Sequence, residues 1–397
     1  MEIDKITTAG EWVNKSWLSK ILGVSVVKAE IEQLNDHGGA IAAMYRIHMT
    51  LEGRETKTAI IKTTKSLEED VLAGAVQVGL PREAFFYAEF GDRVKPELRI
   101  PLVWSSHGDM KKGTKVLLME DLEDCAQAGH FFGPTNPFNG GKDLEALTIG
   151  RGFHYSAEEI TAAAFEQAAV MHAKFWGDVS LLEIHYLKGA AWMRGRDKES
   201  WQAWQDRASN AWAVTKAKIE AGASNVNWCP HLVEVIDASL SKVSWDTFQM
   251  QLSKRSFTFV HGDFHPGNVL VLPPSNELAA LNLVLIDFEA VGVGCGPAEI
   301  AQFIISHMAP RVRRGCEEHL TEGYYNRLMS LMPEGQKYTL EQCRADYIAA
   351  GTAKWIWLLC LLSNMGLSDD MVQVFNDQVA AFVKDHGVTP ENVEMPN

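Results

Sequence analysis

Two short segments of this 397-residue chain carry the side chains that are best suited to take part in a chemical reaction. The first, residues 261–268 (HGDFHPGN), places an aspartate, Asp263, five positions before an asparagine, Asn268. The second places Asp287 and Phe288 directly after the apolar run of residues 283–286 (LVLI). Each segment contains or follows a run of Val, Ile, Leu and Phe that predicts a short buried strand. We therefore expect polar groups at the ends of two buried strands.

The types and spacing of these side chains indicate phosphoryl transfer. In kinases, an aspartate accepts or orients the proton of the attacking hydroxyl, and an asparagine five positions later binds Mg²⁺. An Asp-Phe pair after a later strand supplies the second metal ligand. Because Mg²⁺ prefers oxygen ligands and keeps positions open for phosphate oxygens, this set suits the reaction. The pattern predicts Asp263 as the catalytic residue and Asn268 and Asp287 as metal ligands.

The segment at 261–268 allows two other interpretations. A buried strand, turn and strand could hold acids by chance, but loop and strand occur together here in the order that kinases need. His261 and His265 stand four positions apart, a spacing at which a helix can bind zinc. Pro266 and Gly267 argue against a helix, and no third ligand lies near them in the sequence.

At these residues the chain resembles the aminoglycoside phosphotransferase/choline kinase-like superfamily. The end of a predicted helix, residues 171–176 (MHAKFW), is similar to that of its ecdysteroid kinase-like branch. The resemblance implies an α+β, protein kinase-like fold of two lobes. A β-rich nucleotide-binding lobe would span residues 1–119, and a hinge with a mostly helical catalytic lobe would span residues 120–397. Trp and Gln are usual in that branch where this chain has His265-Pro266 and Glu289, and Glu299 stands in place of the family's Asp, so the branch and the substrate stay open.

The first lobe contains candidates for binding the nucleotide. Lys62 ends an apolar strand at residues 58–62, where kinases place the lysine that contacts the α- and β-phosphates. The alternatives are Lys57 and Lys65, but Lys62 has the most apolar neighbours. The resemblance assigns Glu83 as the ion-pair partner of Lys62, with Glu89 and the acids at 68–70 as alternatives.

Two backbone segments complete the expected nucleotide site. Gly38 and Gly39 join two predicted strands, so their backbone N–H groups could approach the phosphates closely, although a plain hairpin turn has the same composition. The strand at 116–122 resembles the hinge of the family, and this likeness implies that backbone groups near Glu120 and Leu122 bind adenine. The predicted cofactors are ATP and Mg²⁺.

Composition limits the possible partners and location. With 37 basic and 51 acidic residues the formal charge is −14, which disfavours binding to nucleic acid or to anionic membrane surfaces. The apolar run at 355–362 is too short to span a bilayer, so no membrane insertion is expected. Six cysteines without C-x-x-C spacing and an N-terminus unlike a signal peptide predict a cytoplasmic location.

We thus expect an ATP- and Mg²⁺-dependent phosphotransferase that acts on a hydroxyl of a small molecule. The acceptor could be a sterol or other secondary alcohol, an amino alcohol or an amino sugar. Trp201, Trp204 and Trp212 lie on one face of a predicted helix, either as core or as a substrate wall that cages a cation or covers a flat ring. The alternative function is a pseudokinase that binds a nucleotide or a partner. Protein kinase activity is disfavoured because no A-P-E segment is apparent after Asp287.

Two further segments have open roles. Residues 129–155 form a long irregular stretch that could be a lid or a surface excursion. The glycines at 292, 294 and 296 are spaced like a dinucleotide fingerprint, but the surrounding order of elements does not match, so a turn is the better interpretation.

Overall fold

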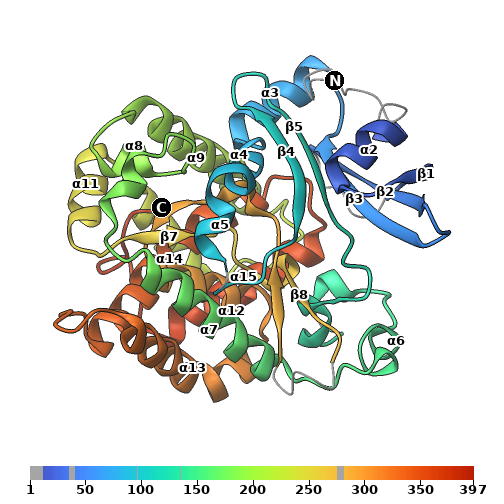
Figure 1. Cartoon of the computed structure of the whole chain (residues 1–397). Helices are drawn as coiled ribbons and strands as arrows, with labels where there is room; N and C mark the ends of the chain where they lie inside the picture. Colours follow the sequence, from blue (N-terminus) through green and yellow to red (C-terminus); the bar gives the residue numbers. More distant parts are fainter. Residues whose placement is uncertain (1–11, 35–40, 96, 135, 275–280) are drawn as a thin grey trace. The chain divides into compact units, whose positions relative to one another are not determined.

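The computed structural model describes residues 12–34, 41–95, 97–134, 136–274 and 281–397, which form parts of two compact units (Figure 1). Unit 1 comprises residues 1–125 and 284–291, and unit 2 comprises residues 126–283 and 292–397. The sequence placed the boundary of the first lobe after residue 119. Unit 1 extends six residues beyond that point and also takes in the short Asp287 segment from far along the chain.

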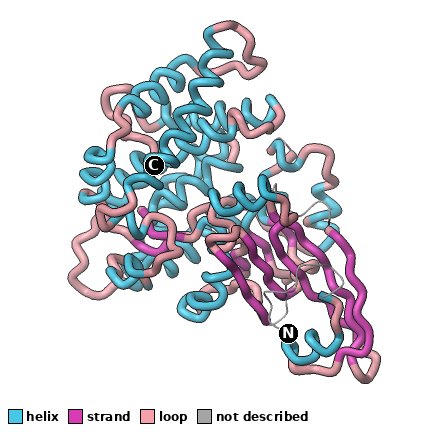
Figure 2. Tube along the Cα trace, turned by 90° about the horizontal axis from the view of Figure 1, so that it is seen from above, coloured by secondary structure: helices cyan, strands magenta, loops and turns pink. Residues whose placement is uncertain are grey.

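Unit 1 is built on one antiparallel sheet with the strand order β1-β2-β3-β5-β4 (Figure 2). Its strands are β1 (Val26–Gln33), β2 (Ala42–Leu51), β3 (Thr56–Thr64), β4 (Val103–Asp109) and β5 (Thr114–Glu120). Strand β3 is exposed over its first three residues and buried over its last six, which include Lys62. Alternating apolar residues on one face of the sheet, such as Ile47, Met49 and Ile61, pack against Trp17 and Leu18 of helix α2.

The helices of unit 1 are short. They are α2 (Lys15–Leu22), α3 (Glu69–Val78), α4 (Arg82–Phe85), the π-helical turn η2 (Phe86–Phe90), α5 (Gly91–Val94) and the 3₁₀ turn η8 (Phe288–Ala290). Gly79 ends α3 in the left-handed conformation, which a residue without Cβ adopts without strain. Pro81 directly precedes α4, and Glu83 lies in the first turn of this helix.

Unit 2 is mostly helical. Its α-helices are α6 (Leu144–Leu147), α7 (Ala157–Lys174), α8 (Ala190–Met193), α9 (Lys198–Glu220), α10 (Pro230–Ser241), α11 (Trp245–Ser253), α12 (Gly296–His307), α13 (Pro310–Leu331), α14 (Leu340–Leu362) and α15 (Asp369–Asp385). All twelve residues of α12 are buried, and the helix packs against α7, α13, α14 and α15. The predicted α+β class, with a β-rich N-terminal part and a mostly helical C-terminal part, is confirmed.

Short strands and 3₁₀ turns complete unit 2. They are β6 (Ala126–Gln127), β7 (Thr258–Val260), β8 (Val269–Val271), β10 (Gly292–Gly294), η3 (Ala128–Phe132), η4 (Pro137–Asn139), η5 (Ile149–Arg151), η6 (Val179–Glu183) and η7 (Pro266–Asn268). Strand β9 (Leu283–Leu285) spans the boundary between the units. Within unit 2, β7 pairs with β10 and β6 pairs with β8, both antiparallel. The loop from β7 to β8 carries Asp263 and Asn268.

Helix α14 is long and apolar enough to cross a membrane by length and composition, but 56% of its most apolar window is buried inside the structure. Trp355, Ile356 and Leu359 are among its buried residues, so α14 is placed as a core helix.

The segment at 129–155 folds into short helical turns. The Nδ2 amide of the buried Asn139 donates to the carbonyl oxygens of Gly129 and Gly133, each at 3.0 Å. Phe138 stacks on the imidazole of His307 in α12, with 5.2 Å between ring centroids. The Asn139 bonds hold the segment together, and the Phe138 contact ties it to α12, which favours a packed surface segment over a free lid.

Candidate active site

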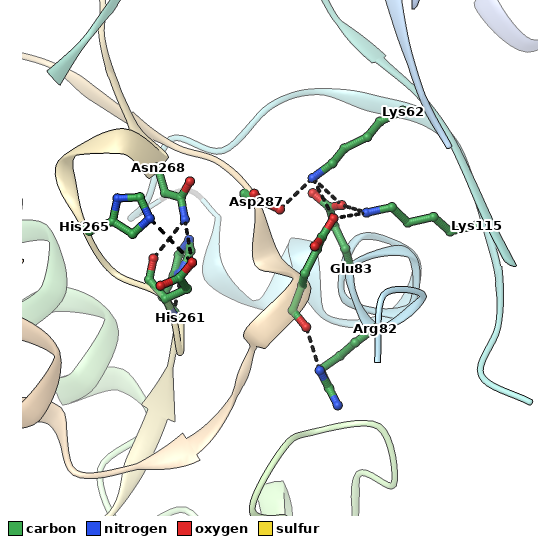
Figure 3. A network of polar contacts seen from close by, with 10 residues as sticks. Lys62, Arg82, Glu83, Lys115, His261, His265, Asn268 and Asp287 are labelled. Carbon is green, nitrogen blue, oxygen red and sulfur yellow. Dashed lines mark hydrogen bonds and ion pairs between the residues drawn. The ribbon is translucent and has the colours of Figure 1, made fainter. Parts of the chain in front are cut away.

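Lys62 lies at the centre of a cluster of carboxylates in unit 1 (Figure 3). Its Nζ is 2.8 Å from Oε2 of Glu83, 2.6 Å from Oδ1 of Asp287 and 3.1 Å from Oε1 of Glu289. Burial alone would lower the pKa of Lys62, but these three carboxylates outweigh burial and raise it well above its ordinary value. Lys62 is therefore a fixed positive charge at every physiological pH.

A second lysine, Lys115 of β5, belongs to the same cluster. In the sheet, Lys62 lies opposite Leu117, and strand alternation places Lys115 on the same face as Leu117. The Nζ of Lys115 contacts Oε2 of Glu83 and lies 2.5 Å from Oε1 of Glu289 (Figure 3). The side chains of Lys115 and Glu83 are both 0% exposed. Two lysines thus neutralise most of the charge of three carboxylates.

Asp287 is held at a bend that follows β9. Its φ of 68° lies in the left-handed region, which costs energy for a residue with a Cβ but is tolerated better by Asp and Asn than by most. The next residue, Phe288, is fully buried and stacks on Phe86 with ring centroids 3.9 Å apart. Arg82 Nη1 also donates to the carbonyl oxygen of Glu289 at 2.6 Å. Phe288 and Arg82 therefore fix the backbone that directly follows Asp287.

Backbone groups at the end of β5 and directly after it differ in whether they form hydrogen bonds. The N–H of Glu120 donates to the carbonyl oxygen of Leu102 at 2.8 Å, and the carbonyl oxygen of Leu122 accepts from the N–H of Cys125 at 3.0 Å. Among the residues that the structure describes, no hydrogen bond is formed by the N–H of Leu122. This N–H therefore remains able to donate a hydrogen bond to a ligand.

In unit 2, three side chains hold the carboxylate of Asp263. Gln302 Nε2 donates to Oδ1 at 2.7 Å, and Asn268 Nδ2 lies 3.3 Å from Oδ2. His265 Nε2 is 3.5 Å from Oδ2, while its Nδ1 accepts from the N–H of Gly267 at 3.0 Å. In the neutral form of His265, an accepting Nδ1 leaves the proton on Nε2, the nitrogen that faces Asp263.

The charge state of Asp263 follows from these neighbours. Burial would raise its pKa, but His265, His261 and Lys354 more than compensate and lower it below the ordinary range. Asp263 is therefore ionised at neutral pH and can accept a hydrogen bond from a hydroxyl group. A carboxylate with a low pKa orients the hydroxyl in the ground state and takes its proton only as the new bond forms.

The backbone before Asp263 is anchored by Glu299 of α12. Its buried carboxylate accepts from the N–H of His261 at 2.9 Å and from the N–H of Gly262 at 2.6 Å. His172 of α7 lies with its Nε2 3.2 Å from the same carboxylate, a contact that supports a structural role for this histidine. Lys354 Nζ donates to the carbonyl oxygen of Gly262 at 3.0 Å. The loop is thus held by three helices, α7, α12 and α14.

The glycine series after Asp287 has a packing explanation. A Cβ at Gly292 would lie 2.3 Å from the carbonyl oxygen of Lys188, and one at Gly296 would lie 2.7 Å from Nδ1 of His172. These contacts are too short for any larger residue, so the glycines permit close approach of chain segments. The prediction of a turn at these glycines is wrong, because Gly292–Gly294 form strand β10 and Gly296 is the first residue of α12.

Each of the two predicted metal ligands, taken separately, has an oxygen atom that could bind a divalent cation. Asn268 uses its amide nitrogen to bond the carbonyl oxygen of Asp263 at 3.0 Å, and within the described residues its amide oxygen has no hydrogen-bond partner. In unit 1, Lys62 contacts Oδ1 of Asp287, and Oδ2 accepts no hydrogen bond from any described residue. Each residue therefore offers one free oxygen of the kind that Mg²⁺ prefers.

The structure thus brings together Lys62, Glu83 and Asp287 in unit 1, and Asp263 and Asn268 in unit 2. Gly38 and Gly39 lie outside the described residues. The sequence analysis did not identify the roles of Lys115, Gln302 and Lys354. A lysine inside the apolar strand at 114–120 was a usable signal for Lys115, but the contacts of Gln302 and Lys354 depend on helix packing.

Comparison with protein families agrees with this geometry. Residues 139–295 match the model of a phosphotransferase enzyme family, and this segment contains Asp263, Asn268 and Asp287. The predicted resemblance is confirmed. Residues 233–384 also match a family described as uncharacterized oxidoreductase dhs-27. No curated protein matches the chain.

Solved structures of small-molecule kinases show weak likeness to the chain. An ethanolamine kinase of Plasmodium vivax is 10% identical with a TM-score of 0.44, covering 89% of this chain and 81% of that chain. The choline kinase LicA from Streptococcus pneumoniae is 11% identical with a TM-score of 0.45, covering 95% and 100%. The amicoumacin kinase hAmiN, in complex with AMP-PNP, Ca²⁺ and Ami, is 11% identical with a TM-score of 0.42, covering 98% of each chain. Likeness this low adds no argument about substrate.

Proposed function

We propose that this protein transfers the γ-phosphoryl group of ATP to a hydroxyl group of a small molecule. The observation that carries the proposal is the cluster in which Lys62 joins Glu83 to Asp287. A buried lysine beside a strand-end Asp-Phe pair is the arrangement with which kinases bind nucleotide phosphates. The match to a phosphotransferase family over residues 139–295 supports the same reaction class.

Each residue has a role that its contacts support. Lys62 would bind phosphate oxygens, and Glu83 would keep its ammonium group in place. Asn268 and Asp287 are the proposed Mg²⁺ ligands, and bound Mg²⁺ would neutralise charge on the phosphate oxygens. The N–H of Leu122 is the proposed donor to adenine.

Asp263 is the proposed catalytic residue. Its carboxylate would accept a hydrogen bond from the acceptor hydroxyl and take the proton as the oxygen bonds to the γ-phosphorus. The bond from the γ-phosphorus to the bridging oxygen breaks, and ADP leaves. Positioning of the hydroxyl and the phosphates supplies most of the catalysis in this chemistry. The six cysteines are all free in the structure, which supports a cytoplasmic location for the reaction.

Thermal unfolding with ATP, in the presence and absence of Mg²⁺, tests the nucleotide site. We expect millimolar Mg²⁺-ATP to raise the midpoint by several degrees in the wild type and in Asp92→Asn, whose side chain is 99% exposed. Asp287→Asn should lose most of this Mg²⁺-dependent rise. The absence of a shift in the wild type would contradict an ATP-dependent enzyme and favour the partner-binding pseudokinase. A shift without ADP release over a broad alcohol panel would indicate a nucleotide-binding pseudokinase.

A further inference from the structure

Two tryptophans of unit 2 hold one lysine of the same unit. The Nζ of Lys188 lies 4.4 Å from the ring centroid of Trp204 in α9 and 5.1 Å from that of Trp357 in α14. The two indole rings are themselves 5.3 Å apart and inclined by 46°. An ammonium group within about 6 Å of an aromatic face is attracted by the ring quadrupole. Trp204 and Trp357 thus form a cation site, and the chain fills it with its own lysine.

Both sides of this site are attached to the Asp263 loop within unit 2. On one side, Lys188 bridges to Gly292 of β10, which pairs with Val260, three residues before Asp263. On the other side, Trp357 follows Lys354 by three residues on α14, so the two side chains lie on neighbouring turns of one face. Lys354 bonds the carbonyl oxygen of Gly262, next to Asp263. The filled cation site is therefore linked through β10 and α14 to the loop that would receive the acceptor alcohol.

Lys188 occupies the site between Trp204 and Trp357 and thereby determines which charge a ligand at this site can carry. A ligand ammonium group entering between Trp204 and Trp357 would have to displace Lys188 or share the site with a like charge, and both are unfavourable. Arg207 adds a further positive charge, with its guanidinium 5.8 Å from the Trp204 ring centroid. The indole faces remain able to contact apolar groups, because cation binding at one face leaves the rest of each ring as apolar surface.

We propose that Lys188 plugs the Trp204–Trp357 site and thereby selects acceptor alcohols that carry no positive charge. The reference to an acceptor in this inference rests on the proposed function. The contacts of Lys188 with Trp204 and Trp357 do not depend on that function. The Lys188 ammonium group excludes choline-like and other cationic amino alcohols from the Trp204–Trp357 site and favours acceptors with an apolar body. Lys188 is a specificity residue in this account and takes no part in the chemical step.

Binding of tetramethylammonium, measured by titration calorimetry and by tryptophan fluorescence, tests the plug without any need for turnover. We expect the wild type to bind it weakly, and Lys188→Met to bind it at least tenfold more tightly, since methionine keeps the apolar stem and removes the charge. Lys188→Gln is the second neutral variant in case Lys188→Met folds poorly. Lys188→Arg, which keeps the charge, and Lys218→Met, at an exposed position of α9, should behave as the wild type.

Two results would overturn the plug. One is wild-type affinity for tetramethylammonium equal to that of the neutral variants. The other is an absence of binding in both Lys188→Met and Lys188→Gln, because an unplugged cation site must bind a cation.

Turnover of choline and of its uncharged isostere 3,3-dimethyl-1-butanol, read by ADP release, tests the selection of the acceptor. The wild type should prefer the isostere at least tenfold in kcat/KM, and Lys188→Met should lose most of this preference. Faster wild-type turnover of choline would contradict the inference while confirming phosphotransfer. If Mg²⁺-ATP is bound but no alcohol of a broad panel is phosphorylated, the proposed function fails, whereas the result for the plug still stands.

Discussion

Lys115 and Glu83 form an ion pair inside unit 1 in which both side chains are fully buried. The same Glu83 carboxylate also lies 2.8 Å from Nζ of Lys62. Glu83 is therefore shared by two lysines, and Lys62 does not have to neutralise it alone. When phosphates draw Lys62 away, Lys115 would still hold the carboxylate in place.

Replacement of Lys115 by methionine should strongly lower the free energy of unfolding. It leaves Glu83 buried with one partner fewer, and breaking a buried pair in this way costs roughly 3–5 kcal/mol. Urea unfolding of Lys115→Met should show a loss of this size. Lys57→Met, in a strand of the same sheet but with a side chain that is 53% exposed, should change the free energy of unfolding by less than about 0.5 kcal/mol. Equal effects of the two replacements would rule out a stabilising Lys115–Glu83 pair.

Asp263→Asn should separate chemistry from nucleotide binding. Asparagine has nearly the same shape but cannot take the proton of the acceptor hydroxyl, so acceptor-dependent ADP release should fall by about 10²–10⁴-fold. The Mg²⁺-ATP-dependent thermal shift should be retained. Asp246→Asn, at an exposed position of α11, is the control and should keep full turnover. Turnover of Asp263→Asn within a few-fold of the wild type would remove Asp263 from the chemical step.

Gln302→Leu should change the pH dependence of turnover. Gln302 donates to Asp263 Oδ1 at 2.7 Å, and its own Oε1 has no partner among the described residues, so leucine removes one useful hydrogen bond. Loss of a donor to the ionised carboxylate raises the pKa of Asp263, so the acid limb of the kcat/KM profile should move to higher pH. We expect kcat/KM near neutral pH to fall about tenfold, because a hydrogen bond to a charged group contributes roughly 1.5–3 kcal/mol.

A matched control for Gln302→Leu is Gln249→Leu. Gln249 also donates one amide bond, to the carbonyl oxygen of Trp192 at 2.9 Å, away from the loop. This variant should keep the wild-type pH profile. An unshifted acid limb in Gln302→Leu would show that Gln302 has only a structural role.

The stability of the protein should fall as the pH decreases from about 6.5. His307 is buried between the rings of Phe138 and His265, and burial together with the His265 charge lowers its pKa well below the ordinary value. In the unfolded chain this histidine binds a proton below about pH 6.5, whereas in the folded chain it does not. Its contribution to stability is complete above pH 6.5 and decreases by up to about 1.4 kcal/mol per pH unit below it.

The slope of unfolding free energy against pH, between pH 6.5 and 4.5, checks this prediction. His307→Gln should show a shallower slope than the wild type, even if its absolute stability is lower because the ring contacts are lost. His154→Gln, at an exposed position, should keep the wild-type slope. His130, whose pKa burial lowers to about 4, should account for part of the slope that remains in His307→Gln. Parallel slopes in the wild type and His307→Gln would contradict the prediction.

The sequence by itself determined the residues whose positions follow from local rules. Asp263, Asn268 and Asp287 were found because strand ends, a Pro-Gly turn and fixed spacing are written in contiguous residues. Lys62 was preferred to Lys57 and Lys65 because apolar neighbours draw a strand inward, and the structure buries Lys62 and leaves the other two exposed. The α+β class was implied by the resemblance of the contiguous motifs to a known superfamily, and the observed strands and helices agree with it.

Only the tertiary structure decided how these residues are held. The pairing register of β3 and β5 places Lys115 beside Lys62, which lies 53 residues before it in the chain. Helix packing brings Glu299 and Gln302 to the Asp263 loop, and it brings Trp204 and Trp357 together around Lys188. Local propensity carries no information about such contacts, because they depend on register and on the rotation of each helix about its axis. The residues proposed for the chemistry were therefore identifiable from the chain, whereas their supporting contacts and the contacts of Lys188 with Trp204 and Trp357 required the fold.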